Sequence, residues 1–143
     1  MNTKLLASAG LALAFAAGFL VRGAVPGEPV AYAQGPKVWE LRTYTVPDKA
    51  KLDLLHKRFK DHSLGFFKRH NMQSIWFGKT IEAPLNETTM VYMLGFPSRE
   101  AAKKSWDEFR ADQAWTAVAK ESGVGPVKIE SVFLEPTDYS PMK

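Results

Sequence analysis

The chain of 143 residues contains no cysteine and only three histidines. Without cysteine there is no disulfide framework, no thiolate nucleophile, no cysteine-ligated metal or iron–sulfur cluster and no lipoprotein-type lipid acceptor. The histidines, His56, His62 and His70, are six and eight residues apart. Metal ligands that share one face of a helix are three or four residues apart, so this spacing argues against a joint metal site and we expect none.

Motifs of several enzyme classes are also missing. The sequence has no serine elbow, no HExxH metalloprotease motif and no closely paired carboxylates. The net charge of +4 is too small to indicate a nucleic-acid partner, and we expect none. What remains, 45% apolar and 24% charged residues, is the composition of one globular domain. The basic residues of the first predicted helix are expected on its outer, solvated half: Lys57, Arg58, Lys60, Lys68 and Arg69.

The amino-terminal segment differs from the rest of the chain. Leu5–Val21 is an uncharged apolar run, and Ala31-Tyr32-Ala33 matches the small-x-small rule of signal peptidase, with Gln34 as the new first residue. We therefore divide the chain into a secretory signal at 1–33 and a domain at 34–143. The alternative is an uncleaved membrane anchor over residues 5–21, since the run is close to the minimum length of a transmembrane helix. Both interpretations predict export, to the periplasm or the cell envelope.

Strand and helix periodicities alternate along the domain. Period-two patterns rich in β-branched and aromatic residues predict strands, and apolar residues three or four apart predict helices. Asp48, Ser98 and Asp112 are predicted N-caps, and Asn71 is predicted to end the first helix in the left-handed conformation. The predicted elements are, in order, strand 37–46, helix 49–70, strands 72–82 and 88–96, a helix after Ser98, a short helix after Asp112, and strand 127–135.

This βαββαβ order predicts an α+β, ferredoxin-like fold, a four-stranded antiparallel sheet with two helices on one face. The strands at 88–96 and 127–135 carry apolar residues on both faces, however, and an apolar face has to be covered. Because no sequence is left for a second helix layer, we expect a second copy of the chain to cover it. The prediction is a homodimer whose sheets pack face to face as a dimeric α/β barrel.

An ordered set of segments runs through the domain: ELRTYTV (Glu40–Val46), FKDHSLGFFKRHN (Phe59–Asn71), SIWFGKT (Ser74–Thr80), SREAAKKSW (Ser98–Trp106), ADQAW (Ala111–Trp115) and ESVFLEPTDYSP (Glu130–Pro141). Together they resemble the NIPSNAP family over about residues 38–141. The resemblance implies a fold of the dimeric α/β-barrel superfamily, which also holds cofactor-free monooxygenases, haem-binding and haem-degrading proteins and small isomerases. The family has no settled catalytic activity, so the resemblance implies a fold more than a reaction.

The first predicted strand carries a polar series on one face, Glu40, Arg42 and Tyr44. A buried carboxylate–guanidinium pair beside a phenol is able to bind a polar ligand or position an anion. The same pair is also suited to setting the register of a dimer interface. Trp76, on the second predicted strand, completes the set of candidate ligand-binding residues.

His62 is the candidate catalytic residue. On a regular helix it falls at the edge of the apolar stripe, between Phe59 and Phe66. It is then either a half-buried side chain at the core edge, or an imidazole that faces a cavity between helix and sheet as proton shuttle, ligand donor or haem ligand.

Two functions stay open at this point. The first is a homodimer that binds a small hydrophobic ligand or a partner protein and uses no cofactor. The alternative is a cofactor-independent or haem-linked enzyme that uses His62.

Overall fold

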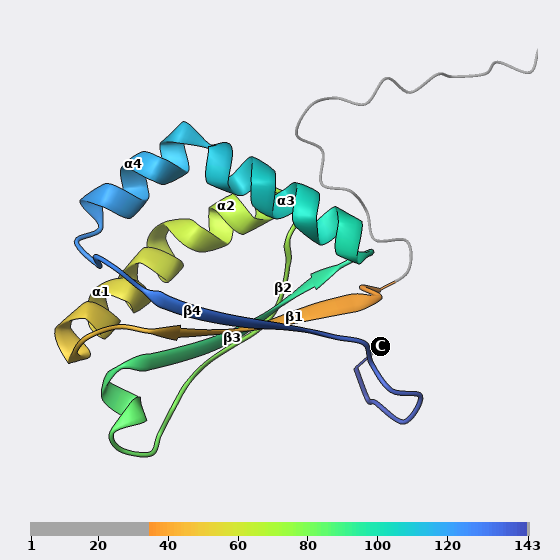
Figure 1. Cartoon of the computed structure of the whole chain (residues 1–143), viewed down its shortest axis with the longest axis horizontal. Coiled ribbons are helices and arrows are strands. Elements are labelled where there is room, and N and C mark those ends of the chain that lie inside the picture. The colour runs from red at the N-terminus through yellow and green to blue at the C-terminus, as the bar shows by residue number, and fades with distance from the viewer. Residues whose placement is uncertain (1–34, 143) are drawn as a thin grey trace, which may run out of the picture.

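A single antiparallel sheet forms the base of the molecule (Figure 1). The computed structural model describes residues 35–142. Within them the sheet has the order β2-β3-β1-β4, so β1 is central and pairs with both β3 and β4. The strands are β1 (Val38–Thr45), β2 (Gln73–Lys79), β3 (Thr89–Phe96) and β4 (Lys128–Leu134).

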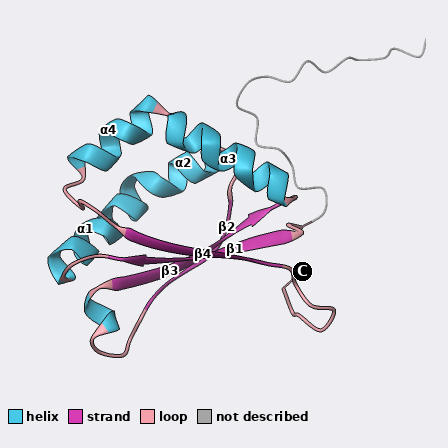
Figure 2. Cartoon of the chain, viewed as in Figure 1, coloured by secondary structure: helices cyan, strands magenta, loops and turns pink. Residues whose placement is uncertain are grey.

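The helices lie together on one side of this sheet (Figure 1, Figure 2). The first helical segment consists of α1 (Lys49–Arg58), a π-helical turn η1 (Phe59–Ser63) and α2 (Leu64–Arg69). The second consists of α3 (Arg99–Ala111) and α4 (Gln113–Glu121). The 3₁₀ turn η2 (Leu85–Glu87) lies in the connection between β2 and β3. This element order and strand order are those of the ferredoxin-like fold, which confirms the predicted fold class.

Local side-chain chemistry sets where the helices begin and end. The carboxylates of Asp48 and Asp112 and the hydroxyl of Ser98 accept hydrogen bonds from backbone N–H groups in the first turns of α1, α4 and α3. Asn71 has a φ of 56°, the left-handed conformation that ends the first helical segment. The predicted caps are confirmed.

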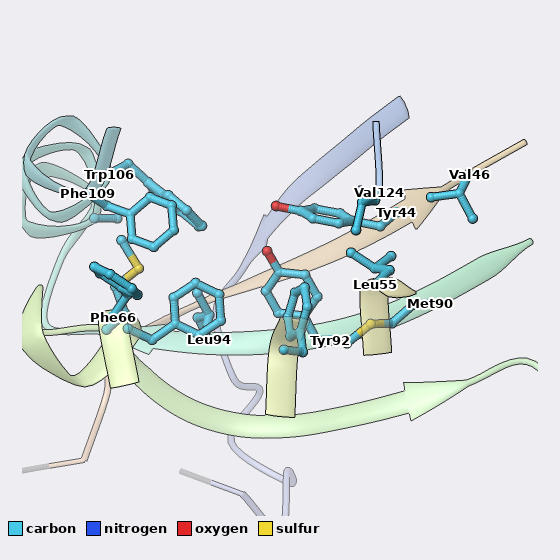
Figure 3. Packing of buried hydrophobic residues seen from close by; sticks show 14 of the residues in the cluster. Tyr44, Val46, Leu55, Phe66, Met90, Tyr92, Leu94, Trp106, Phe109 and Val124 are labelled. Carbon is cyan, nitrogen blue, oxygen red and sulfur yellow. The ribbon is translucent and has the colours of Figure 1, made fainter. Parts of the chain in front are cut away.

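The core fills the space between the helices and the sheet (Figure 3). Tyr92 and Leu94 on β3 are fully buried against Leu55, Phe59 and Phe67 of the first helical segment. The rings of Phe59 and Tyr92 meet edge to face, with 5.1 Å between their centroids. The apolar stripes predicted for both helical segments are therefore the faces that pack on the sheet.

The opposite face of the sheet is bare within residues 35–142 (Figure 1). Because neighbouring residues of a strand point to opposite faces, this face carries the residues that alternate with the core positions. Trp39 is buried there, and the other apolar residues are partly buried or exposed and mostly aliphatic: Leu41, Val91, Met93, Val132 and Leu134. The prediction that both faces of the sheet carry apolar residues is confirmed. That a second copy of the chain covers the bare face stays a prediction.

The predicted signal or anchor segment at 1–33 lies outside the described residues. No helix within the described part of the chain is long and apolar enough to cross a membrane.

Candidate functional site

A hollow of about 350 Å³, which we call the aromatic pocket, opens between β1, β4 and the helix layer. Aromatic rings from β1, α3 and α4 contribute to its wall. In Figure 1, α4 continues beyond the end of α3. The aromatic and aliphatic lining consists of Tyr44, Trp106, Phe109, Trp115, Val127 and Ile129. The polar lining is three arginines, Arg42, Arg58 and Arg110.

A second hollow of about 460 Å³, the rim hollow, adjoins it toward the start of α3. The two share Arg42, Trp106 and Arg110, so they form one cleft along the β4 side of the molecule. Charged side chains of both signs line the rim hollow, among them Glu40, Glu100 and Lys103. The Arg99 guanidinium lies 3.7 Å from the ring centroid of Phe133.

Glu40 ties the sheet to the helix layer at the junction of the two hollows. Its side chain is almost completely buried, with 1% of the residue exposed. Trp106 Nε1 of α3 donates to Glu40 Oε2 at 2.5 Å, Ser131 Oγ of β4 donates to Oε1 at 2.5 Å, and Arg42 donates to the same Oε1 at 2.6 Å. A buried carboxylate needs such partners to offset its desolvation. Glu40 therefore holds Arg42 and Trp106 in place.

Arg42 presents a fixed positive charge to both hollows. Its guanidinium lies 4.1 Å from the ring centroid of Trp106 and pairs with Glu40. Burial alone would lower the pKa of Arg42. The nearby Tyr92, Tyr44 and Glu40 together outweigh this effect, so the pKa of Arg42 is above its ordinary value. The charge of Arg42 is thus balanced by a carboxylate before any ligand enters.

Arg58 is the last residue of α1 and lines the aromatic pocket from the helix side. Only 7% of the residue is exposed. Its guanidinium stacks on Trp115 at 5.3 Å, and its Nε has no hydrogen-bond partner among the described residues. Burial lowers the pKa of Arg58, although a guanidinium remains protonated at neutral pH. Sequence patterning placed Arg58 on the solvated half of the helix, and that prediction is wrong.

Tyr44 lines the pocket, and the fully buried Tyr92 lies next to it in the core. Their rings meet edge to face at 5.2 Å, and their hydroxyls lie close together in Figure 3. Burial, with smaller contributions from Tyr44 and Glu40, raises the pKa of Tyr92 well above its ordinary value. Tyr92 is therefore a neutral phenol at physiological pH. Glu40, Arg42 and Tyr44, predicted as one polar series, do face the same cleft.

His62 does not face this cleft. It is exposed and lines an outer groove of about 420 Å³ between the first helical segment and α4. The prediction of a core-edge position assumed a regular helix, but residues 59–63 form the π turn. The backbone N–H of Leu64 bonds the carbonyl of Phe59, five residues back, so this turn holds one more residue than an α-helical turn. The extra residue places His62 toward solvent.

Trp76 lies on the bare face of the sheet. It pairs with Met93 in the register, whereas its neighbour Phe77 pairs with Tyr92 and stacks on it. A register shift between Ser74 and Trp76 marks a bulge in β2. Half of Trp76 is exposed, and a Cβ added at Gly78 would overlap its indole. The structure thus separates Trp76 from the other predicted ligand-binding residues.

The three histidines have different surroundings. Burial, then Lys79, lowers the pKa of the half-buried His56, and His70 Nε2 lies 2.9 Å from Asp112 Oδ2 at the start of α4. No cluster of metal-ligating side chains occurs among residues 35–142.

The residues that the sequence reasoning missed are Arg58, Trp106 and Trp115. Both tryptophans pack on the core and also line the cleft. Arg58 follows Leu55 by three residues, which puts it beside the buried stripe. That spacing was the available signal for a buried arginine.

Known proteins share this fold. A family model described as NIPSNAP matches residues 39–141. A NIPSNAP family protein from Agrobacterium tumefaciens is 22% identical with a TM-score of 0.64, covering 74% of this chain and 98% of that one. A NIPSNAP domain protein from Burkholderia xenovorans is 23% identical with a TM-score of 0.61, covering 73% of this chain and 98% of that one.

Comparison with curated proteins finds no match. The likeness to the solved structures, at these identities, shows the fold alone. The family model is more specific, because it covers the sequence from β1 to the segment beyond β4. The chain therefore belongs to the NIPSNAP family.

Proposed function

We propose that the protein is a homodimer that binds a small hydrophobic ligand in the cleft under α3 and α4. The observation that carries the proposal is the aromatic pocket itself. Its volume of about 350 Å³ lies within the range of roughly 300–1,000 Å³ that is common for small-molecule sites. Its wall combines rings and aliphatic side chains with a few fixed polar groups, the composition that such sites have.

The rings are held in place by packing and hydrogen bonding. Phe109 and Trp115 lie 4.5 Å apart between centroids, and Trp106 is fixed by its bond to Glu40. A pocket whose walls are already ordered loses little conformational entropy when a ligand enters. These walls fit a small ligand that is planar or aliphatic.

Binding is favoured over the enzymatic alternative by the position of His62. The imidazole lies in the outer groove with Lys57 and Asp61, on the far side of the helix layer from Tyr44 and the sheet. Glu40, the buried carboxylate of the cleft, already accepts bonds from Trp106, Ser131 and Arg42. The groups that face the pocket are thus suited to holding a ligand.

The bare face of the sheet supports the homodimer. Leu41, Met93 and Val132 lie next to one another in the register across β3, β1 and β4. A continuous aliphatic patch of this kind is typical of a surface that associates. A two-fold axis brings the same patch of two copies into contact, and two-fold symmetry is the commonest symmetry of homo-oligomers.

Export remains part of the proposal and is supported by the sequence at 1–33. A mature protein beginning at Gln34, detected by intact mass in the periplasmic fraction of its own host, is the expected result. An uncut chain in the membrane fraction would instead support the anchor.

Ligand binding is tested by filling the pocket. Ile129 lines the aromatic pocket and is exposed, so Ile129→Trp is expected to fill the cleft while the chain still folds. Ile81→Trp is the matched control, because Ile81 is exposed in the connection between β2 and β3, away from the cleft.

Calorimetric titration with 2-naphthamide and 2-naphthoate should show binding to the wild type and to Ile81→Trp. At least a tenfold loss of affinity is expected for Ile129→Trp. Equal affinities in the three proteins, or no binding of either compound to any of them, would refute the site.

A further inference from the structure

We infer that Arg58 is the anion receptor of the aromatic pocket, and that the ligand is an apolar acid whose carboxylate pairs with its guanidinium. This inference rests on the proposed function, because it names the chemical class of the ligand for the same pocket. It is based on which of the arginines that line the pocket have an acidic partner.

Two of the three pocket arginines already have acidic partners. Arg42 pairs with Glu40 at 2.6 Å, and Arg110 pairs with Asp107 at 2.7 Å. Arg58 has no ion pair and no side-chain hydrogen bond within residues 35–142, although it is more than nine-tenths buried. No carboxylate lines the aromatic pocket. The pocket therefore holds one positive charge that nothing in the described chain neutralises.

A buried charge without a partner costs folding free energy. Such a charge in a pocket indicates a site where a ligand of opposite charge binds. Trp115 stacks against the Arg58 guanidinium, and such stacking on a face leaves the in-plane N–H groups free to bond an anion. A guanidinium bonds a carboxylate with two parallel N–H donors, which fixes the orientation of the acid. The rings of the pocket would then contact the apolar body of the ligand.

The backbone at Arg58 is also held in an unusual way. The π turn starts at the next residue, and the hydroxyl of Ser63 donates to the carbonyl of Arg58 at 3.3 Å. Ser63 is completely buried. A π turn within an α-helix is frequently found at a functional site, and here it follows directly on the buried arginine.

The outer groove is the other space that Arg58 borders. Asp61 and Glu121 line that groove, and Asp61 is already paired with Lys57 at 2.5 Å. Arg58 forms an ion pair with neither acid. Lys57 neutralises Asp61, so Glu121 is the acid that opposes an anion in the outer groove. The aromatic pocket has no acid in its lining, which favours an anion on that inner side of Arg58.

A pair of probes that differ only in charge tests the inference. 2-Naphthoate and 2-naphthamide have the same ring system, and at pH 7.5 the first is ionised and the second neutral. By calorimetry we expect the wild type to bind 2-naphthoate at least tenfold more tightly. Arg58→Gln should lower the affinity for 2-naphthoate to that for 2-naphthamide, and Arg58→Lys should retain part of the preference.

Arg69→Gln is the control, because Arg69 is an arginine of the same helical segment with 58% of its side chain exposed. It should keep the wild-type preference. Equal affinity of the wild type for both probes would overturn the inference and leave the proposed function standing. Binding of neither probe would refute both. If Arg58→Gln does not fold, the wild type and Arg58→Lys still decide the question.

Discussion

On β1, Glu40, Arg42 and Tyr44 point toward the helices, while Leu41 and Thr43 point the other way. The covered face joins large rings to a buried network of charges and hydrogen bonds, each with a specified partner. The bare face carries mainly aliphatic residues together with the indole of Trp76, and its aliphatic residues make no such polar contacts. The two faces of one strand therefore contribute differently: one makes directional bonds that shape a cleft, and the other is an apolar surface suited to assembly.

The largest effect is expected on the covered face. Glu40→Ala would leave Arg42, Trp106 and Ser131 without their shared acceptor, so the free energy of unfolding should fall by about 3–5 kcal/mol. Urea denaturation measures this loss. Glu40→Gln is the control, since its amide keeps the shape and one acceptor and should cost less. An unchanged stability in Glu40→Ala would mean that the network does not tie the helices to the sheet.

The bare face should respond in assembly rather than in folding. Met93→Lys places a charge in the centre of the proposed dimer interface, and we expect the dimer dissociation constant to rise about a hundredfold, or ~2.8 kcal/mol. Light scattering at micromolar concentration reports the mass. Thr116→Lys, exposed on α4, should remain dimeric. A wild type that is monomeric under these conditions would contradict the dimer and leave the cleft unaffected.

A smaller, pH-dependent effect is expected in the helix layer. The hydrogen bond from His70, followed by those from the backbone of α4 and from Arg69, lowers the pKa of Asp112 below its ordinary 3.8. The unfolded chain therefore takes up this proton first as the pH falls. The stabilisation is present above about pH 4 and is lost as the pH falls through the lowered pKa.

Asp112→Asn tests this pH dependence, because asparagine still caps the helix but has no charge. Its melting temperature should lie a few degrees below that of the wild type at pH 6, and the difference should shrink toward pH 3. Asp138→Asn, in the segment after β4, serves as the control. A difference that does not change with pH would show that the Asp112 charge contributes nothing.

The smallest effect concerns the indole on the bare face. A methyl group at Gly78 would overlap the exposed ring of Trp76, which is free to swing aside. Gly78→Ala should cost about 1 kcal/mol or less. Gly65→Ala is the matched control, since a Cβ there meets open space within α2 and should stabilise the chain slightly. A loss of several kcal/mol at Gly78 would show that the ring is held firmly.

Most of the fold was predictable because its determinants are local. Asp48 and Ser98 cap helices through bonds to backbone groups a few residues away, and Asn71 ends a helix by its own conformation. The core stripes follow from simple periodicity. Family membership agreed with this assignment and was confirmed by the match over 39–141.

The candidate site was predictable only in part. Glu40, Arg42 and Tyr44 share a regular strand, so their common direction follows from alternation. His62 and Arg58 flank or lie in the π turn, and Trp76 follows the bulge in β2. Each irregularity adds one residue to a periodic element, and the sequence shows no separate signal for it. The periodic argument therefore gave the wrong position for His62. Arg58 precedes the π turn, and its spacing of three residues from Leu55 already indicates its burial.

The π turn also means that the segment 59–63 does not tolerate the loss of a residue. Deleting one codon between 59 and 63 would leave an ordinary helix, whose two halves must rotate by roughly 100° relative to each other. Either Leu52 and Leu55 or Phe66 and Phe67 would then leave the core, although every residue type that packs there is still encoded. The same deletion in the exposed connection at 80–88 would only shorten a loop.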